Sequence, residues 1–390
     1  MVGTLEHGVS KKYHCSKFIK EKNNMNEVSV AIIGCGRIAG HHCQSMLNVD
    51  GVKLVAVCDL VKEKAKNFSE IYDVPWYVNY REMLKKHTNI NTVAIITPSG
   101  MHYEHGMEMI AEYKKNIIVE KPTFMRIDEL EQIYKKANSL NLKIFPVFQN
   151  RYNKAVSFIK KSLSNGELGD VRTISVKSQW CRTQRYYELS PWRGTFSHDG
   201  GALANQGIHL VDLLLYLGGS VDKVNCTMRT LGSDIEVEDT AVSTCIYKSE
   251  SVATLEVTTA ARPDDFEASI IIVCSKGLVK IGGVAVNELQ TYTPNPSACK
   301  KYSEDFSRAI GVYGNGHNKM YADIVTSILY NEQFPVTEDS CYNTLKLLNT
   351  FYLSDERSSW TSVSDRNVSD RLGKYDDSIS DIYRTSLTYD

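Results

Sequence analysis

Short apolar runs alternate with amphipathic stretches along the first part of the chain. The runs have the length and β-branched content of buried strands, and they are VSVAII (28–33), VKLVAVC (52–58), NTVAII (91–96), NIIV (116–119) and LKIF (142–145). The stretches between them, such as 62–74 and 127–141, carry apolar residues at helical spacing. Because a crossover between parallel strands needs a helix to cover the sheet, the alternation predicts an α/β Rossmann domain with a doubly wound parallel sheet over residues 27–148.

The pattern changes after residue 148. One amphipathic helix is expected over 153–165, and strict alternation of apolar and polar residues then dominates 171–290, interrupted by helical spacing only at 201–218. Two more helices are expected at 317–331 and 340–356. This pattern predicts an α+β domain with a large, mostly antiparallel open sheet over 149–353.

The two ends of the chain look different from this core. Residues 1–26 are polar and basic and form an N-terminal extension of unassigned role. Residues 354–390 are rich in Ser and Asp with few apolar anchors, so we expect a loosely held polar C-terminal tail.

Composition narrows the class of protein. The chain has 390 residues, 45 of them basic and 46 acidic, so no charge excess favours nucleic acid or anionic lipid as a partner. The N-terminus lacks a secretory apolar segment and no apolar run is long enough to span a membrane, so we expect a cytoplasmic protein. Ten cysteines are scattered singly with no CxxC pair, which favours reduced core thiols over disulfides or zinc.

A glycine motif directly follows the first strand. Gly34-Cys35-Gly36-Arg37-Ile38-Ala39 is GxGxxA, in which Gly34 permits the tight turn and Gly36 lets the backbone approach a pyrophosphate at the start of the next helix. Asp59 ends the second strand, where a carboxylate accepts hydrogen bonds from the ribose hydroxyls of an adenosine and repels a 2′-phosphate. The pair predicts NAD rather than NADP as cofactor.

Other chemical groups follow the later strands. Thr97, Pro98 and Ser99 are expected to border the dinucleotide, because the carboxyl edge of a parallel sheet lines the ligand crevice. His102 and His105 have no third ligand at metal spacing and are interpreted as histidines on a helix surface, so no metal site is predicted.

Two groups suit proton transfer. Lys121 follows a strand and would project into the same crevice, where partial desolvation lowers a lysine pKa; the alternative is a lysine that only lies at a strand end. Asn205, His209 and Asp212 fall at i, i+4 and i+7 and would share one helix face, from which an imidazole can take a hydroxyl proton; a satisfied core histidine is the alternative.

AIIGCGRIAGHH, TPSGMH, VEKP and NQGIHLVD, in that order, resemble the glucose–fructose oxidoreductase/inositol dehydrogenase/MocA family, and the resemblance covers residues 27 to about 350. It implies a Rossmann domain, a β-sheet domain, a bound nicotinamide cofactor, and catalysis by Lys121 with His209. Many members carry aspartate where this chain has Asn205, which favours a hydrogen-bonding role for that residue.

Further segments, including WRGTFSHDGGALANQGIHLVDLL, VEDTAV and YGNGH, are similar to the branch that oxidises the 3-hydroxyl of UDP-N-acetylglucosaminuronic acid. The resemblance implies these cofactor contacts: Gly34, Gly36, Arg37, Ile38, Asp59, Thr97, Pro98, Ser99, His102, Glu120, Lys121, Gln149, Trp192 and Arg193. It implies these substrate contacts: Lys121, Gln149, Arg151, Arg185, Tyr186, Tyr187, Arg193, Asn205, His209, Tyr313 and His317. Guanidinium and phenol groups suit a pyrophosphate and a uronate.

Several functions stay open at this point. One alternative is a UDP-N-acetylglucosamine 3-dehydrogenase, because the two substrates differ only in the acid group at the sixth carbon of the sugar. An inositol or free-sugar dehydrogenase is a further alternative. A regulator that binds NAD without catalysis belongs to a different class, although it would not need Lys121 and His209. Some relatives regenerate their cofactor with 2-oxoglutarate, which makes it a candidate second substrate. The relatives form dimers and tetramers, so we expect a homo-oligomer.

Overall fold

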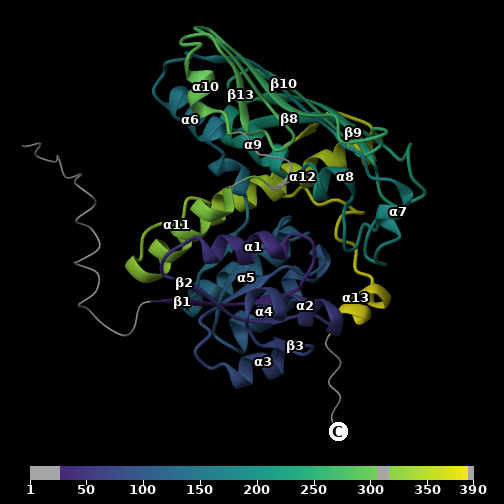
Figure 1. Cartoon of the computed structure of the whole chain (residues 1–390). Coiled ribbons are helices and arrows are strands. Elements are labelled where there is room, and N and C mark those ends of the chain that lie inside the picture. Colours follow the sequence, from purple (N-terminus) through teal and green to yellow (C-terminus); the bar gives the residue numbers. More distant parts are fainter. Residues whose placement is uncertain (1–26, 305–313, 315, 385–390) are drawn as a thin grey trace, which may run out of the picture.

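The chain folds into two domains that share a set of helices (Figure 1). The structure is a computed structural model, and it describes residues 27–304, 314 and 316–384. The expected residue Tyr313 and the extension 1–26 lie outside the described residues. In the described part, none of the helices combines the length and apolar composition needed to cross a membrane.

The first domain is built on a six-stranded sheet in the order β3-β2-β1-β4-β5-β6, with every neighbouring pair parallel. Its strands are β1 (Val28–Ile33), β2 (Val52–Cys58), β3 (Trp76–Tyr77), β4 (Thr92–Ile95), β5 (Asn116–Val119) and β6 (Ile144–Pro146). Its helices are α1 (Ala39–Leu47), α2 (Lys62–Tyr72), α3 (Tyr80–Lys86), the 3₁₀ turn η1 (Ser99–Met101), α4 (His102–Ala111) and α5 (Ile127–Ser139). The Rossmann prediction is confirmed.

The second domain is built on an eight-stranded sheet in the order β13-β12-β11-β7-β10-β9-β8-β14, antiparallel except for the pair β10 and β7. Its strands are β7 (Val171–Gln179), β8 (Val221–Arg229), β9 (Thr240–Tyr247), β10 (Val252–Thr258), β11 (Glu267–Cys274), β12 (Leu278–Gly282), β13 (Glu288–Tyr292) and β14 (Thr361–Ser362). The prediction of a mostly antiparallel sheet is confirmed.

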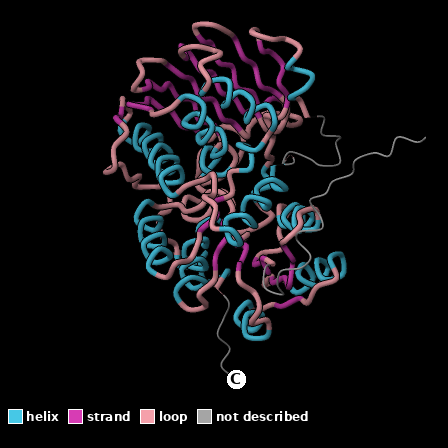
Figure 2. Tube along the Cα trace, turned by 90° about the vertical axis from the view of Figure 1, so that its left-hand side faces the viewer, coloured by secondary structure: helices cyan, strands magenta, loops and turns pink. Residues whose placement is uncertain are grey.

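The helices of this domain lie on the side of the sheet that faces the Rossmann domain (Figures 1 and 2). They are η2 (Gln149–Tyr152), α6 (Lys154–Ser164), α7 (Gln184–Tyr187), α8 (Gly201–Asn205), α9 (Ile208–Gly218), α10 (Ala298–Tyr302), α11 (Gly316–Tyr330) and α12 (Glu338–Arg357). The last helix, α13 (Asp377–Tyr383), packs on η1 of the Rossmann domain. Helix α11 packs on α1, and α12 packs on α5, α9 and β8, so both helices contact both domains. Beyond β5, Lys121 bonds to Asn205 at the end of α8 and gives a further contact between the two domains.

The expected loose tail is wrong for residues 354–384. Residues 354–357 complete α12, β14 pairs with β8, and the Leu372 side chain is buried. Arg384, at the end of α13, binds Glu104 on α4, so the segment returns to the Rossmann domain. Polar contacts stabilise most of this segment. Its sequence therefore has few apolar residues, and the hydrophobic pattern did not indicate an ordered structure.

The cysteines agree with the sequence expectation. All nine in the described part are free, and most of them are buried in the core. Burial raises the pKa of the Cys43 thiol to about 12, so this group is an inert core side chain.

Candidate active site

The glycine turn after β1 has the geometry that the motif predicts. Gly34 has φ +99°, and a Cβ on it would lie 2.3 Å from the carbonyl oxygen of Ile96. A Cβ on Gly36 would meet nothing in the protein within 4 Å, so the space above this backbone is open. No side chain in the described part caps the following helix α1. The open space above the Gly36 backbone lies beside the uncapped N-terminus of α1. This arrangement suits the binding of a dinucleotide pyrophosphate.

Asp59 fixes this turn relative to β2. One of its carboxylate oxygens accepts a hydrogen bond from the backbone N–H of Cys35 at 2.8 Å, and the other accepts one from Val61 at 2.8 Å. Each oxygen keeps a lone pair, so the carboxylate can still accept from ribose hydroxyls. Ile38 is half-buried and Arg37 is exposed at the start of α1. Thr97 and Pro98 are half-buried beyond β4, and Ser99 is buried.

The surface interpretation of His102 and His105 is wrong. Both side chains are buried, with 1% and 2% exposed. The ring nitrogens of His102 lie 2.9 Å from the Pro122 carbonyl and 3.0 Å from the Thr97 carbonyl, so the ring ties two strand ends together. Helical spacing alone did not reveal that these histidines are buried, because the first turn of α4 packs against the segments that follow β4 and β5.

Lys121 lies just beyond β5, at the same edge of the sheet as Gly34, Asp59 and Thr97. Its Nζ donates hydrogen bonds to the backbone carbonyl of Asn205 at 2.8 Å and to Asn205 Oδ1 at 2.9 Å. The side chain therefore crosses from the Rossmann domain to the end of α8. Burial lowers the pKa of Lys121, while the negative charges of Glu120 and Asp199 oppose that shift.

Asp199 is a group that the sequence reasoning missed. Its side chain is 1% exposed, and its carboxylate accepts hydrogen bonds from the backbone N–H of Gly194 at 2.7 Å and from the side-chain amide of Asn205. Burial raises the pKa of Asp199, whereas these hydrogen bonds and the charges of Arg193 and Lys121 lower it. The HDGG sequence carried no periodic signal for this position, because Asp199 lies in a loop.

The expected single helix through Asn205, His209 and Asp212 is wrong. Asn205 ends α8 and His209 lies in the first turn of α9, with a break at Gln206 and Gly207. The backbone N–H of Gly207 still reaches back to Ala202, so the two short helices remain close together. Asn205 and His209 therefore stay on the side of Lys121, whereas Asp212 faces away from it toward Arg151.

His209 is buried beside Gln149. The two Nε2 atoms lie 3.1 Å apart, which requires the Gln149 amide to donate and the imidazole to accept. Burial, followed by the charge of Lys121, lowers the pKa of His209 to about 3. His209 Nδ1 and Gln149 Oε1 have no hydrogen-bond partner among the described residues, so one donor and one acceptor remain for a ligand.

Glu120 and His317 lie behind Lys121. Glu120 Oε1 is 2.9 Å from His42 Nε2, and His42 Nδ1 is 2.8 Å from the Tyr321 hydroxyl. His317, buried in the first turn of α11, packs edge-on against His42, and its ring nitrogens have no hydrogen-bond partner within the described ranges. Donor atoms of His42, Glu120 and His317 lie within 4.8 Å of one another. Both nitrogens of His42 are engaged by Glu120 and Tyr321, whereas those of His317 are not.

Trp192 and Arg193 lie half-buried in the loop before α8. The Arg193 guanidinium is 4.2 Å from the Tyr186 ring centroid and 4.6 Å from the Trp192 ring, and it donates to the Tyr186 hydroxyl. Its Nε is buried with no hydrogen-bond partner in the part of the chain that is described. Arg185 is exposed on α7. This loop offers cationic and aromatic groups for an anionic ligand.

Two expected substrate residues have other partners. Arg151 forms a buried bidentate pair with Asp212, with Nε to Oδ2 at 2.7 Å and the second contact at 2.5 Å, and it also donates to Ser340. The Tyr187 hydroxyl is buried against Thr259 at 2.9 Å. Both groups are engaged within the second domain, so the structure gives them a packing role.

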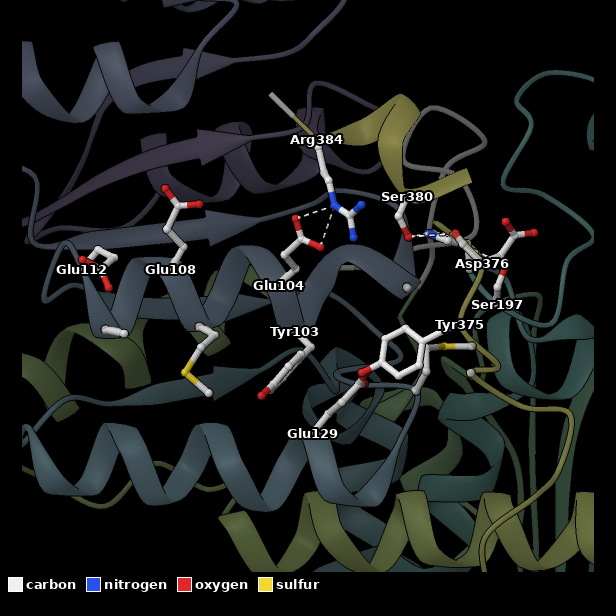
Figure 3. Close-up of a pocket in the computed structure, with 16 residues that line it drawn as sticks. Tyr103, Glu104, Glu108, Glu112, Glu129, Ser197, Tyr375, Asp376, Ser380 and Arg384 are labelled. Atoms are coloured by element: carbon white, nitrogen blue, oxygen red, sulfur yellow. Dashed lines mark hydrogen bonds and ion pairs between the residues drawn. The ribbon is translucent and has the colours of Figure 1, made fainter. Parts of the chain in front are cut away.

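A cavity of about 460 Å³ lies apart from this constellation, between α4, α5 and the segment leading to α13 (Figure 3). Glu104 and Glu108 project from α4, Glu112 directly follows that helix, and Tyr375 and Arg384 come from the C-terminal segment. The predicted cofactor and substrate residues do not line this cavity. The candidate site is the group of residues around Lys121 at the carboxyl edge of the parallel sheet.

Comparison with known proteins agrees with this geometry. Residues 28–148 match the family described as "Oxidoreductase family, NAD-binding Rossmann fold", and residues 156–280 match the "GFO/IDH/MocA C-terminal domain". The chain belongs to the Gfo/Idh/MocA oxidoreductases. It is therefore an NAD-dependent dehydrogenase that acts on a secondary alcohol.

Two solved relatives are similar over nearly their whole length. The WlbA dehydrogenase of Bordetella pertussis, in complex with NADH and UDP-GlcNAcA, is 28% identical, with a TM-score of 0.81 over 88% of this chain and 99% of that one. The corresponding enzyme of Chromobacterium violaceum, with the same ligands, is 30% identical, with a TM-score of 0.78 over 88% and 98%. Glucose-6-phosphate 3-dehydrogenase of Bacillus subtilis is 24% identical over 70% of this chain and 76% of that protein.

Proposed function

We propose that this Gfo/Idh/MocA enzyme oxidises the 3-hydroxyl of UDP-N-acetylglucosaminuronic acid to a 3-keto sugar. The observation that carries the proposal is the Lys121–Asn205 contact beside His209, at the sheet edge where the glycine turn opens. Two relatives with this fold, at 28% and 30% identity, hold NADH and UDP-GlcNAcA, which supports a UDP-sugar as the substrate.

The reaction removes a hydride from the carbon and a proton from its hydroxyl. NAD+, when bound, supplies the hydride acceptor. Lys121 is the better proton acceptor of the two candidates: burial lowers its pKa from the ordinary lysine value, whereas the pKa of His209 is only about 3. The unpartnered Nδ1 of His209 and Oε1 of Gln149 can bind the sugar and orient the hydroxyl.

The loop at Trp192 and Arg193 is the proposed position for the acidic parts of the substrate. Arg193 keeps one buried N–H free among the described residues, and the neighbouring Tyr186 offers a phenol. A UDP-N-acetylglucosamine 3-dehydrogenase remains the second candidate, because glucose-6-phosphate 3-dehydrogenase shows that a relative acts at position 3 of a different sugar.

NADH absorbance tests the proposal. Purified protein is mixed with NAD+ and either UDP-N-acetylglucosaminuronic acid, UDP-N-acetylglucosamine or glucose 6-phosphate, each with and without 2-oxoglutarate. We expect reduction with the uronic acid, loss of activity by roughly 10²–10⁴-fold in Lys121→Ala, and no change in the exposed control Lys66→Ala. A preference for a neutral sugar would contradict the proposed substrate, and tight NAD binding without turnover of any of them would favour the regulator.

A further inference from the structure

Among the described residues, the side-chain NH₂ of Asn205 donates a hydrogen bond to Asp199 alone, and Asp199 is nearly completely buried. It lies in the loop between α7 and α8, and its second oxygen accepts the Gly194 N–H at 2.7 Å. Burial raises the pKa of Asp199, and its two N–H donors together with the charges of Arg193 and Lys121 oppose that rise and favour the ionised carboxylate. The loop therefore places a negative charge one side chain away from Lys121.

The orientation of the Asn205 amide follows from its two neighbours. Lys121 Nζ, 2.9 Å from Oδ1, needs an acceptor when it is an ammonium, and the Asp199 carboxylate needs a donor. The observed orientation satisfies both groups. The opposite orientation would place NH₂ against the ammonium and a carbonyl against the carboxylate, so Asp199 fixes which atom of Asn205 meets Lys121.

We propose that Asp199 is a positioning residue that acts through the Asn205 amide to orient Lys121 and supplies the negative charge that position 205 lacks. The relay runs from the Asp199 carboxylate to the Asn205 NH₂, and from Asn205 Oδ1 to Lys121 Nζ. The inference rests on the proposed role of Lys121 as proton acceptor.

The charges around Lys121 give this relay a measurable consequence. Burial lowers the pKa of Lys121; Glu120 and Asp199 raise it, and Arg193 and Arg182 lower it. The neighbouring His209 is neutral, because its pKa is about 3. Removing the Asp199 charge leaves two guanidinium groups opposed by Glu120 alone, so Lys121 should lose its proton at a lower pH.

Competitive chemical labelling of lysines, followed by mass spectrometry across a pH series, measures this without turnover. We expect the apparent pKa of Lys121 to fall by at least about half a unit in Asp199→Asn. The matched control is Asp239→Asn: Asp239 is equally buried and accepts backbone N–H bonds from Leu231 and Gly232, and within the described part of the chain it is not hydrogen-bonded to Asn205. An unchanged or higher Lys121 pKa in Asp199→Asn would overturn the proposal.

The labelling result stands even if the substrate is not the proposed sugar, so the two failures are distinguishable. With an active substrate, we expect kcat of Asp199→Asn to fall by about 10–100-fold with little change in KM for NAD+. The acidic limb of its pH profile should move to lower pH together with the labelled pKa.

A variant in which the carboxylate and the amide exchange places distinguishes a positioning role of Asp199 from a role in packing alone. The double variant Asp199→Asn/Asn205→Asp keeps one carboxylate and one amide but puts the carboxylate directly beside Lys121. We expect it to restore both the Lys121 pKa and kcat to within about tenfold of wild type. If the single variant does not fold, this double variant carries the test: a folded double variant as slow as Lys121→Ala would contradict the proposal.

Discussion

His42 and Glu120 join the first helix of the Rossmann domain to the end of β5, directly before Lys121. His42 Nε2 lies 2.9 Å from Glu120 Oε1, and both side chains are buried. The Tyr321 hydroxyl binds the other nitrogen of His42, so α11 is fixed to the same pair. The position of Lys121 therefore depends on a contact between three elements far apart in the sequence.

This contact predicts how acid affects stability. Burial alone would raise the pKa of Glu120, but the His42 hydrogen bond and the charges of His42 and Lys121 outweigh it and lower the pKa to about 2. The ionised carboxylate thus stabilises the fold above pH ~4.5, and this stabilisation, on the order of 3 kcal/mol, is lost as pH falls toward 2. In Glu120→Gln, we expect a lower free energy of unfolding at pH 7 than in wild type. We also expect that free energy to fall less than in wild type between pH 5 and 3. Urea unfolding measures both quantities.

The exposed pair Lys66–Glu70 provides the control for that experiment. Glu70→Gln should leave the pH dependence of unfolding as in wild type, because exposed ion pairs contribute little. Parallel curves for wild type and Glu120→Gln would contradict the assignment.

Glu238 predicts the opposite pH dependence. Its side chain is buried, and it accepts hydrogen bonds from the Leu203 N–H at 3.0 Å and the Tyr352 hydroxyl at 2.7 Å. Burial raises its pKa to about 8. A raised pKa means that its contribution is fully present below pH ~4.5 and is lost as pH rises through about 8.

We therefore expect Glu238→Gln to remove a fall in stability between pH 5 and 8 that amounts to a few kcal/mol in wild type. The amide oxygen can still accept from Leu203 and Tyr352, so the variant should fold. Thermal unfolding across this range measures the difference. A variant whose melting temperature follows the wild-type curve at every pH would show that Glu238 is ionised throughout.

The sequence predicted the fold well where a continuous apolar run marks an element. Strands β1, β2, β4 and β5 each form such a run, and their parallel order follows from the helices between them. Strands β3, β13 and β14 and the helices α7, α10 and α13 were missed, because they are short segments with no clear apolar run or helical spacing. The 354–384 segment was misjudged because polar contacts hold it.

The candidate site shows a similar division. Gly34, Asp59 and Lys121 were predicted because each follows a strand of the same parallel sheet, and such strands end at one edge. Asp199 and His42 could not be predicted, since one lies in a loop and the other pairs with a residue 78 positions away. Whether Arg185, Tyr186 and His317 bind substrate stays a prediction.

The buried pair Arg151–Asp212 yields a prediction about stability rather than catalysis. Arg151→Met would leave the Asp212 carboxylate buried, with the Thr344 hydroxyl at 3.1 Å as its one remaining hydrogen-bond donor among the described residues. Removing one partner of a buried ion pair costs about 3–5 kcal/mol. We expect a large loss of unfolding free energy with KM for the sugar unchanged at temperatures where the variant is folded. A raised KM at unchanged stability would return Arg151 to the substrate site.

The two glycines of the turn separate stability from cofactor binding. A Cβ on Gly34 would overlap the Ile96 carbonyl, and its φ of +99° is strained for any side chain, so Gly34→Ala should destabilise the fold by at least ~1–3 kcal/mol. A Cβ on Gly36 meets open space, so Gly36→Ala should change the unfolding free energy by less than about 1 kcal/mol. The same methyl would occupy the space that the pyrophosphate needs, and we expect NAD affinity to fall by about tenfold or more. Thermal unfolding without cofactor measures the stability, and NAD titration by calorimetry measures the affinity. A stable Gly36→Ala protein with wild-type NAD affinity would place the dinucleotide elsewhere.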